Sequence, residues 1–437
     1  MRGRVAGVLL LAALIVGLLP PLSATGSELV PRLRHVVMEG LPAAVTGEAG
    51  LSQQVLAPAA FSLVGVSVPE GTRVLLRTGD AAGVWSPWVE TEALADDGDG
   101  PEPGSHEAAE ARPGWERMSE PLWVGEASHL QVRVLGGDPG DVAVHLVDSL
   151  GLSRSLLQRF VDAWRAPWRA AGITEAQAST RPPIVTRAQW GADESRRRGN
   201  PAHSASTRAG ILHHTAGSND YTPEQAPGIV RAIYAYHTGA LGWSDIGYNL
   251  LVDRFGTIYE GRAGGLEQGV IGAHAGGFNT ETFGISIIGT FMSALPPGPA
   301  RSAAVSAIAW KFQQHGINAD PNATVDIVSR GSTRYPQGAT ARMHTLSAHR
   351  DVSATACPGD ALYAHMGELR QQVYAGVPPP PPVPVPPPRR LLPDLPGMLP
   401  ELDLPLTDAD LPVTPPTVPP AVSERRPTMR LRDLVPW

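Results

Sequence analysis

Gly210-Ile-Leu-His-His-Thr215 is the stretch around which the fold is organised, because it is short, apolar and ends in polar side chains. A run of this kind predicts a strand buried in a sheet. Phe283–Gly289 predicts a second buried strand, and residues 248–253 and 256–260 predict a hairpin that turns at Asp-Arg-Phe-Gly. These segments place a sheet in the middle of this part of the chain.

Three helices are expected around this sheet. The first begins at Thr222, because Thr suits the N-cap position and Pro223 suits the first turn. The others cover residues 300–315 and 359–375. The apolar positions that face inward in the second helix are Val305, Ile308, Ala309 and Phe312. Strands that alternate with helices and include a hairpin predict an α/β domain over residues 182–376, with a mixed central β-sheet flanked by helices.

Residues 61–150 have a different pattern, typical of a small all-β sandwich-like domain. Apolar and polar residues alternate at period two, with turn residues between the runs. The alternating runs are Phe61–Val68, Thr72–Arg77, Leu130–Val134 and Val142–Val147. Residues 96–113 are acidic and Gly-rich, which predicts a long loop. The tryptophans Trp85, Trp88, Trp115 and Trp123 are expected to pack in the core and at the edges, the alternative being a sugar-stacking surface.

The first 24 residues are expected to be a signal peptide for export. Arg2 and Arg4 precede an apolar run, and small residues near Ala24 suit cleavage. The alternative is an uncleaved anchor, but the run is about 15 residues long, which is short for a membrane span. No other stretch is long and apolar enough, so no stable membrane span is expected after cleavage.

The remaining segments connect or extend the two domains. Residues 25–60 are expected to be a flexible lead-in, and residues 151–181 a helical linker. Residues 377–437 hold 20 of the 44 prolines, so a Pro-rich disordered tail is expected there.

The charge distribution separates the two domains and excludes one class of partner. Residues 25–180 carry 21 acidic and 11 basic side chains, whereas residues 181–376 carry 14 and 16. This asymmetry supports separate domains. The net charge of −7 argues against nucleic acid as a partner, because that binding needs a positive face. Composition does not decide the oligomeric state.

Cys357 is the only cysteine, so no internal disulfide can form. A lone thiol in an exported protein is buried and inert, or a nucleophile, or a metal ligand. His213-His214 and His349 supply imidazoles elsewhere in the same domain. Two imidazoles and one thiolate match a zinc site with three protein ligands and one open position, and soft sulfur favours zinc over magnesium or calcium.

A series of motifs in one order identifies a family. The stretches are Arg187-Ala-Gln-Trp-Gly191, Ile211-Leu-His-His-Thr-Ala216, Tyr236-His237, Gly242-Trp-Ser-Asp-Ile-Gly-Tyr248, Gly256-Thr-Ile-Tyr-Glu-Gly-Arg262, Gly272-Ala-His-Ala275, Phe278-Asn279, Gly284-Ile-Ser-Ile-Ile-Gly289, and His349-Arg-Asp through Cys357-Pro-Gly359. Over about residues 182–376 the chain thereby resembles the type 2 N-acetylmuramoyl-L-alanine amidases and the related peptidoglycan recognition proteins. Neither the sandwich-like domain nor the proline tail shares in this resemblance.

The resemblance implies a role for each matching residue. The implied zinc ligands are His213, His349 and Cys357, with His214 as a neighbour. Tyr248 stands at the catalytic tyrosine of the family, and Thr355 stands where relatives help to polarise the scissile carbonyl, some of them with Lys. The implied muramyl peptide contacts are His237, His274 and Asn279.

The activity implied by the resemblance is zinc-dependent hydrolysis of the amide bond between N-acetylmuramic acid and L-alanine, in cell-wall remodelling or autolysis. The alternative is a module that binds peptidoglycan or muropeptides without cutting them. Non-catalytic relatives commonly lack the cysteine, which favours the enzyme. A zinc peptidase of another type ranks last, because the chain has no His-Glu-x-x-His motif. The expected partner is bacterial peptidoglycan, the expected location is outside the cell or in its envelope, and the expected source is bacterial.

Overall fold

The structure is a computed structural model that describes residues 34–38, 52–56, 60–91, 93–94, 98–149 and 181–377. The expected signal peptide, the helical linker apart from Arg181, and the proline tail apart from Val377 lie outside the described residues. Their boundaries remain predictions. Among the described residues, no helix combines the length and hydropathy that a membrane span requires.

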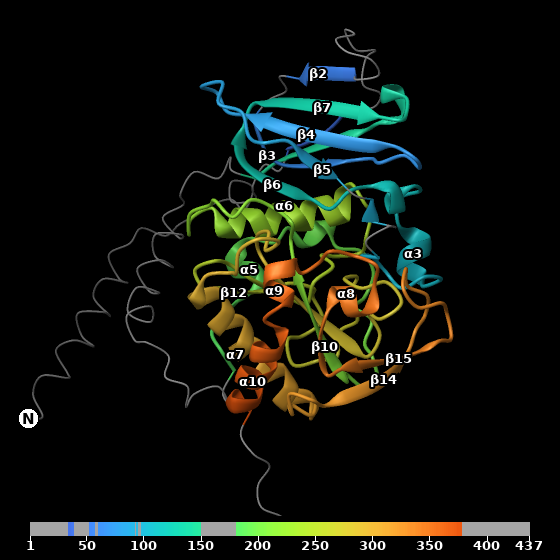
Figure 1. Cartoon of the computed structure of the whole chain (residues 1–437), viewed down its shortest axis with the longest axis vertical. Coiled ribbons are helices and arrows are strands. Elements are labelled where there is room, and N and C mark those ends of the chain that lie inside the picture. The colour runs from blue at the N-terminus through green and yellow to red at the C-terminus, as the bar shows by residue number, and fades with distance from the viewer. Residues whose placement is uncertain are drawn as a thin grey trace, which may run out of the picture. The chain divides into compact units, whose positions relative to one another are not determined.

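The N-terminal part forms two four-stranded sheets in which every pairing is antiparallel (Figure 1). The first sheet has the order β1 (Arg34–Met38), β8 (Val144–Asp148), β3 (Phe61–Val66), β6 (Leu122–Ala127). The second has the order β2 (Ser52–Leu56), β7 (His129–Leu135), β4 (Arg73–Gly79), β5 (Val89–Thr91). Their inner faces share one apolar cluster of mostly Val and Leu side chains. The sandwich-like prediction is confirmed.

The flexible lead-in expected over residues 25–60 is wrong in two places. Arg34–Met38 pairs with β8 and Ser52–Leu56 pairs with β7, so each five-residue strand extends one sheet at its edge. Five residues are too few for apolar and polar positions to alternate clearly in a sequence. These two strands are recognised only by their pairing with β8 and β7.

The tryptophans of this part behave in two ways. Trp115 and Trp123 are buried in the core, as expected. Trp85 and Trp88 are half-buried at the outer face, where Arg77 lies over both rings at 5.0 and 4.8 Å. The stacked guanidinium accounts for these two rings as edge packing.

The second part is built on a six-stranded mixed sheet, as predicted. Its order is β16 (Leu346–Ala348), β10 (Ala209–His214), β13 (Thr282–Ile287), β11 (Leu250–Val252), β12 (Ile258–Glu260), β9 (Ile184–Val185). Only the predicted hairpin of β11 and β12 is antiparallel, and the other pairs are parallel. The sheet brings the carboxyl ends of β10, β13 and β16 to one edge.

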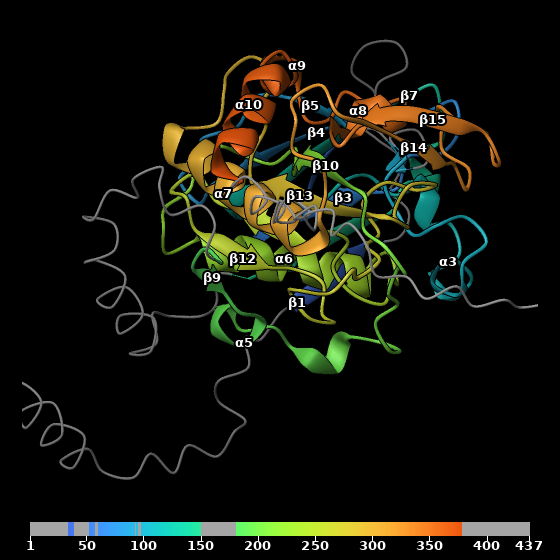
Figure 2. The ribbon, with the colours of Figure 1, turned by 90° about the horizontal axis from the view of Figure 1, so that it is seen from below.

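Helices cover both faces of this sheet. On one face, α7 (Gly298–His315) and α10 (Met366–Gly376) pack side by side over an apolar cluster (Figures 1 and 2). On the other, α6 (Ala226–Gly239) is buried along most of its length. A short α5 (Arg187–Trp190) packs against α6.

Two helix predictions need correction. The first helix begins at Ala226 and not at Thr222, because residues 222–225 form a turn in which the Thr222 carbonyl accepts the Gln225 N–H. Pro227 then occupies the first turn of the helix, where its missing N–H costs nothing. The last helix is two, α9 (Asp360–Tyr363) and α10, separated at Ala364 and His365.

A hairpin of β14 (Thr324–Val328) and β15 (Thr340–His344) was not foreseen. Its strands are half exposed and weakly apolar, so their pattern does not stand out. The short helix α8 (His349–Val352) follows β16 directly. His349, the first residue of α8, therefore lies at the carboxyl end of β16.

The sandwich and the α/β part share one apolar cluster. Leu63 and Trp123 of the sandwich lie in the same cluster as Ile233 and Tyr236 of α6. α6 thus packs between β3 and β8 on one side and the central sheet on the other (Figure 1). The contact is close, because a Cβ built on Gly65 would stand 2.2 Å from the Tyr236 ring. The two parts are therefore packed as one unit, and the domain boundaries themselves stay predictions.

Candidate metal centre

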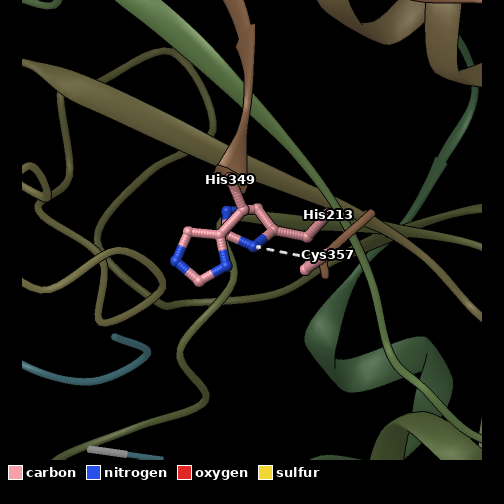
Figure 3. Close-up of side chains that lie close together, drawn as sticks. All are labelled: His213, His349 and Cys357. Atoms are coloured by element: carbon pink, nitrogen blue, oxygen red, sulfur yellow. Dashed lines mark hydrogen bonds between the residues drawn. The ribbon is translucent and has the colours of Figure 1, made fainter. Parts of the chain in front are cut away.

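Three side chains that the sequence nominated as metal ligands lie together in the interior. The potential ligand atoms of His213, His349 and Cys357 all lie within 4.8 Å of one another, and the three residues are buried (Figure 3). Cys357 Sγ is 3.8 Å from His213 Nδ1. Sulfur and nitrogen ligands on one tetrahedral zinc ion stand about 3.6 Å apart. The donor set and its spacing therefore fit zinc.

The topology explains why residues 136 positions apart meet. His213 is near the carboxyl end of β10, and His349 follows β16 immediately as the first residue of α8. β10 and β16 are parallel neighbours, so their carboxyl ends meet at one edge of the sheet. This arrangement places the imidazole of His213, in β10, next to that of His349, directly after β16, and the two can supply a pair of nitrogen ligands.

The loop that carries Cys357 is held by its own hydrogen bonds. Thr355 Oγ1 accepts the Cys357 N–H at 3.0 Å. The Arg350 guanidinium donates to the Ala356 carbonyl and to the Asp360 carboxylate. These contacts fix the thiol against β10, where the backbone N–H of His214 points at Sγ over 3.4 Å.

The two consecutive histidines of β10 have different surroundings, because successive strand residues face opposite sides. His213 presents Nδ1 to Cys357 and places Nε2 3.1 Å from His274 Nδ1. His214 accepts the Phe291 N–H through its own Nδ1. A second nitrogen held by a neighbour is the usual arrangement for a metal-binding imidazole.

Burial favours the neutral form of these imidazoles. It lowers the pKa of His349 to about 3 and that of His214 to about 4. Burial, followed by the charges of His349 and His274, also holds the pKa of His213 well below its ordinary value. Neutral imidazole is the form that binds a metal.

Tyr248 lies beside the three candidate ligands. Its ring centroid is 5.4 Å from that of His213, and the residue is buried. Burial, followed by the nearby carboxylates of Glu120 and Asp99, raises the pKa of Tyr248 well above its ordinary value. The phenol therefore stays protonated and is available as a hydrogen-bond donor.

Thr355 is half-buried and lies on the rim of a surface hollow. The side chains around this hollow are Arg334, Arg350, Ser353, Ala354, Thr355, Ala356 and Tyr363. Its hydroxyl is engaged with the backbone of Cys357, two positions along. Thr355 thus lies close to the candidate ligand Cys357, with its oxygen turned toward its own loop.

The three predicted peptide contacts are all buried. His237 accepts the Gly247 N–H and stacks against Trp243 with centroids 4.6 Å apart. Burial, followed by the Arg262 charge, lowers the pKa of His237 to about 3. His274 contacts His213, and Asn279 Oδ1 accepts the N–H groups of residues 274 and 275.

A segment of the sandwich domain covers this site, and the sequence did not predict it. Residues 98–120, here called the covering segment, contain the short helix α3 (His106–Glu110). Within this segment Asp99 is buried, and its Oδ1 is 3.9 Å from His213 Nδ1 and 3.7 Å from His349 Nε2. The acidic, Gly-rich composition of residues 96–113 had predicted a long loop, and the helix α3 lies within that range. The opposite net charges of the two halves of the chain were the one signal of such a contact.

Comparisons with known proteins agree with the geometry. The family model described as N-acetylmuramoyl-L-alanine amidase matches residues 203–360. Residues 28–147 match the model described as Rv3811 N-terminal galactose-binding domain-like. This second match covers both edge strands that the sequence did not predict.

Relatives match the α/β part along most of their own length. Peptidoglycan-recognition protein SC1a/b of Drosophila simulans is 33% identical over 184 residues, which are 41% of this chain and 82% of that protein. Peptidoglycan recognition protein 1 of Bos taurus is 33% identical over 184 residues, 41% of this chain and 80% of that protein. The chain belongs to the family of type 2 N-acetylmuramoyl-L-alanine amidases and peptidoglycan recognition proteins.

Two solved structures of peptidoglycan recognition proteins are also similar to this chain. Drosophila PGRP-LB is 28% identical with a TM-score of 0.33, over 42% of this chain and 92% of that one. Human PGRP-IβC in complex with glycosamyl muramyl pentapeptide is 29% identical with a TM-score of 0.34, over 42% of this chain and 94% of that one.

Proposed function

We propose that the chain is a zinc-dependent N-acetylmuramoyl-L-alanine amidase, which hydrolyses the amide bond between N-acetylmuramic acid and the L-alanine of the stem peptide. The observation that carries the proposal is the buried set of His213, His349 and Cys357, within 4.8 Å, beside Tyr248. Membership of the family supports amidase activity or peptidoglycan binding. The complete donor set favours the enzyme.

The residues would divide the work as follows. His213, His349 and Cys357 would hold zinc, which when bound polarises a carbonyl and activates water. His274 would fix the orientation of the His213 ring through the Nδ1–Nε2 contact at 3.1 Å. Three protein ligands alone would leave one coordination position for substrate chemistry, as catalytic zinc sites need.

Tyr248 and Thr355 would serve the charge that develops on the scissile carbonyl. Tyr248 is protonated, so it can donate a hydrogen bond to the developing oxyanion. Thr355 carries a second hydroxyl beside Cys357. The proposed muramyl peptide contacts are His237, His274 and Asn279. Peptidoglycan is the proposed partner, and export through residues 1–24 would bring the protein to it.

The competing function is binding of muropeptides without cutting. The decisive assay incubates the full chain with a muramyl pentapeptide, with zinc and with a chelator, and follows free peptide by mass spectrometry. Wild type, Cys357→Ala and Asp99→Ala chains are compared, because Asp99 lies against both histidines. Zinc-dependent release that Cys357→Ala abolishes supports the enzyme. Saturable binding without release by either zinc-loaded wild type or Asp99→Ala would leave a recognition module.

A further inference from the structure

The Asp99 carboxylate faces the same atoms that would bind the metal. His213 Nδ1, which is 3.8 Å from Cys357 Sγ, is 3.9 Å from Asp99 Oδ1. His349 Nε2 is 3.7 Å from the same oxygen. Nitrogen and oxygen ligands on a tetrahedral zinc ion stand about 3.3 Å apart. A contraction of about half an ångström would thus bring the carboxylate into the coordination sphere.

Backbone contacts on either side hold Asp99 in place. The Gly98 carbonyl accepts the Gly276 N–H at 2.7 Å, and the Gly100 carbonyl accepts Asn279 Nδ2 at 2.8 Å. Both glycines have positive φ, +80° and +137°. A Cβ at Gly100 would stand 2.3 Å from the Trp115 ring, so only glycine permits this turn. The Gly98-Asp99-Gly100 turn therefore aims one carboxylate at the two imidazoles.

Charged groups fasten the rest of the covering segment. The Glu102 carboxylate accepts the N–H groups of Gly277 and Thr280 at 2.7 and 2.6 Å. Glu107 binds Arg262 through two hydrogen bonds of 2.7 and 2.8 Å, and both side chains are largely buried. Their partners lie on the α/β part, so these contacts attach the covering segment to this surface.

Asn279 connects the covering segment with the proposed substrate contacts. It is one of the proposed muramyl peptide contacts, yet its amide already donates to Gly100. The backbone of the covering segment thus occupies a hydrogen-bonding group that the proposed function assigns to substrate.

We infer that Asp99 is a fourth metal ligand, supplied by the sandwich domain, and that the resting chain holds zinc in a closed His-His-Cys-Asp site. Four protein ligands close a zinc site, whereas catalysis needs one open position. The covering segment must therefore leave before a muramyl peptide can enter. The ligand assignment stands on the geometry alone, and the consequence for hydrolysis rests on the proposed amidase function.

The test uses the full chain loaded with Co²⁺ in place of zinc, because the visible spectrum of Co²⁺ reports its ligands. Azide is the probe of an open position. Wild type, Asp99→Ala and Asp99→Asn are compared, with Glu116→Gln as the matched control, since Glu116 is an exposed acid of the same segment. Zinc affinity is measured in parallel by chelator competition.

The expected results separate the variants clearly. Azide should shift the Co²⁺ spectrum of Asp99→Ala and Asp99→Asn but leave wild type and Glu116→Gln unchanged. Zinc affinity should fall at least about 10-fold in both Asp99 variants, the lower bound seen for disturbed zinc sites. Equal azide shifts and equal zinc affinities in wild type and both Asp99 variants would overturn the ligand assignment.

Peptide release in the same samples tests the closure separately. Release by zinc-loaded Asp99→Ala should exceed that of wild type by about 10-fold, because the change opens the fourth position and removes the bond between the segment and the metal. Lower release by Asp99→Asn than by wild type would instead make Asp99 a base for the reaction and would overturn the closure. If no zinc-loaded chain releases peptide, the amidase proposal fails, while the azide and affinity results still decide whether Asp99 is a ligand.

Discussion

The metal centre and the covering segment are built in different ways, although they meet at Asp99. The centre takes its histidines from the ends of parallel strands, so regular structure fixes their positions. The covering segment is mostly irregular and is positioned by individual carboxylates, each of which meets a partner on the α/β part. An acidic, Gly-rich stretch therefore predicts only a loop in the sequence, even where specific contacts hold it against another part of the protein.

Loss of the thiolate should have the largest effect. Cys357→Ser replaces a soft ligand by a poor one, so zinc affinity should fall by more than about 100-fold, beyond the loss seen when only a supporting residue is removed. Chelator competition measures the change. Without metal, the variant and wild type should unfold at similar temperatures, and a variant that binds zinc like wild type would show that Cys357 is not a ligand.

Truncation in the shared core should have the next largest effect. Leu63 is fully buried in the cluster that joins the sandwich to α6, so Leu63→Ala should lower the free energy of unfolding by about 2–5 kcal/mol. Calorimetry should show one transition moving as a whole. The exposed Val84→Ala is the control. A separate transition for the sandwich alone would mean that the two parts do not unfold together.

Removal of the His274 side chain, which contacts His213, should lower the zinc affinity of the candidate metal centre without abolishing it. His274→Ala frees the His213 ring to turn, so zinc affinity should fall about 10–100-fold. The matched control is His365→Ala, because His365 lies between α9 and α10 and its Nδ1 is 2.9 Å from the Ala361 carbonyl oxygen. Equal zinc affinity in both variants would contradict a supporting role for His274.

Replacement of Glu107, which anchors the covering segment, should lower the free energy of unfolding moderately and in a pH-dependent way. Burial opposes ionisation of Glu107, but the charge and hydrogen bonds of Arg262 outweigh it, so the pKa of Glu107 lies below its ordinary 4.5. Glu107→Gln should therefore cost about 2 kcal/mol of unfolding free energy at neutral pH. A group with a lowered pKa stabilises above its unfolded value. The difference from wild type should hold above pH 4.5 and shrink as the pH falls below it, and a difference that grows on acidification would refute the assignment.

The smallest effect should come from an ion pair on the surface of the sandwich. Arg73 and Glu90 bind each other at 2.6 Å, but both are exposed. Water and salt screen such pairs, so Glu90→Gln should leave the melting midpoint unchanged within error. A clear loss of stability would mean that this exposed pair stabilises the protein as the buried pair of Glu107 and Arg262 does, and would contradict the role given to burial.

The sequence predicted what rests on pattern and missed what rests on tertiary contact. The strands around His213 and the helix ending at His315 follow from apolar periodicity. The family resemblance implied the candidate ligands His213, His349 and Cys357, and the structure places their ligand atoms within 4.8 Å of one another. The start of α6 was predicted at Thr222, because Thr has the right chemistry for a helix N-cap. Thr222 instead begins the turn that precedes the helix, which starts at Ala226. The position of Asp99 had no local signal, since a carboxylate between two glycines fits many turns and only its neighbours in space give it a role.

The most direct test of the amidase is where the oxygen of water goes. A muramyl pentapeptide is incubated in H₂¹⁸O with zinc-loaded wild type and Asp99→Ala, and the products are analysed by mass spectrometry. Amide hydrolysis at the muramyl bond predicts ¹⁸O in the lactyl carboxylate of N-acetylmuramic acid and an unlabelled peptide with a free L-alanine amine. Label in a peptide carboxylate, or binding without any product from either chain, would contradict the account.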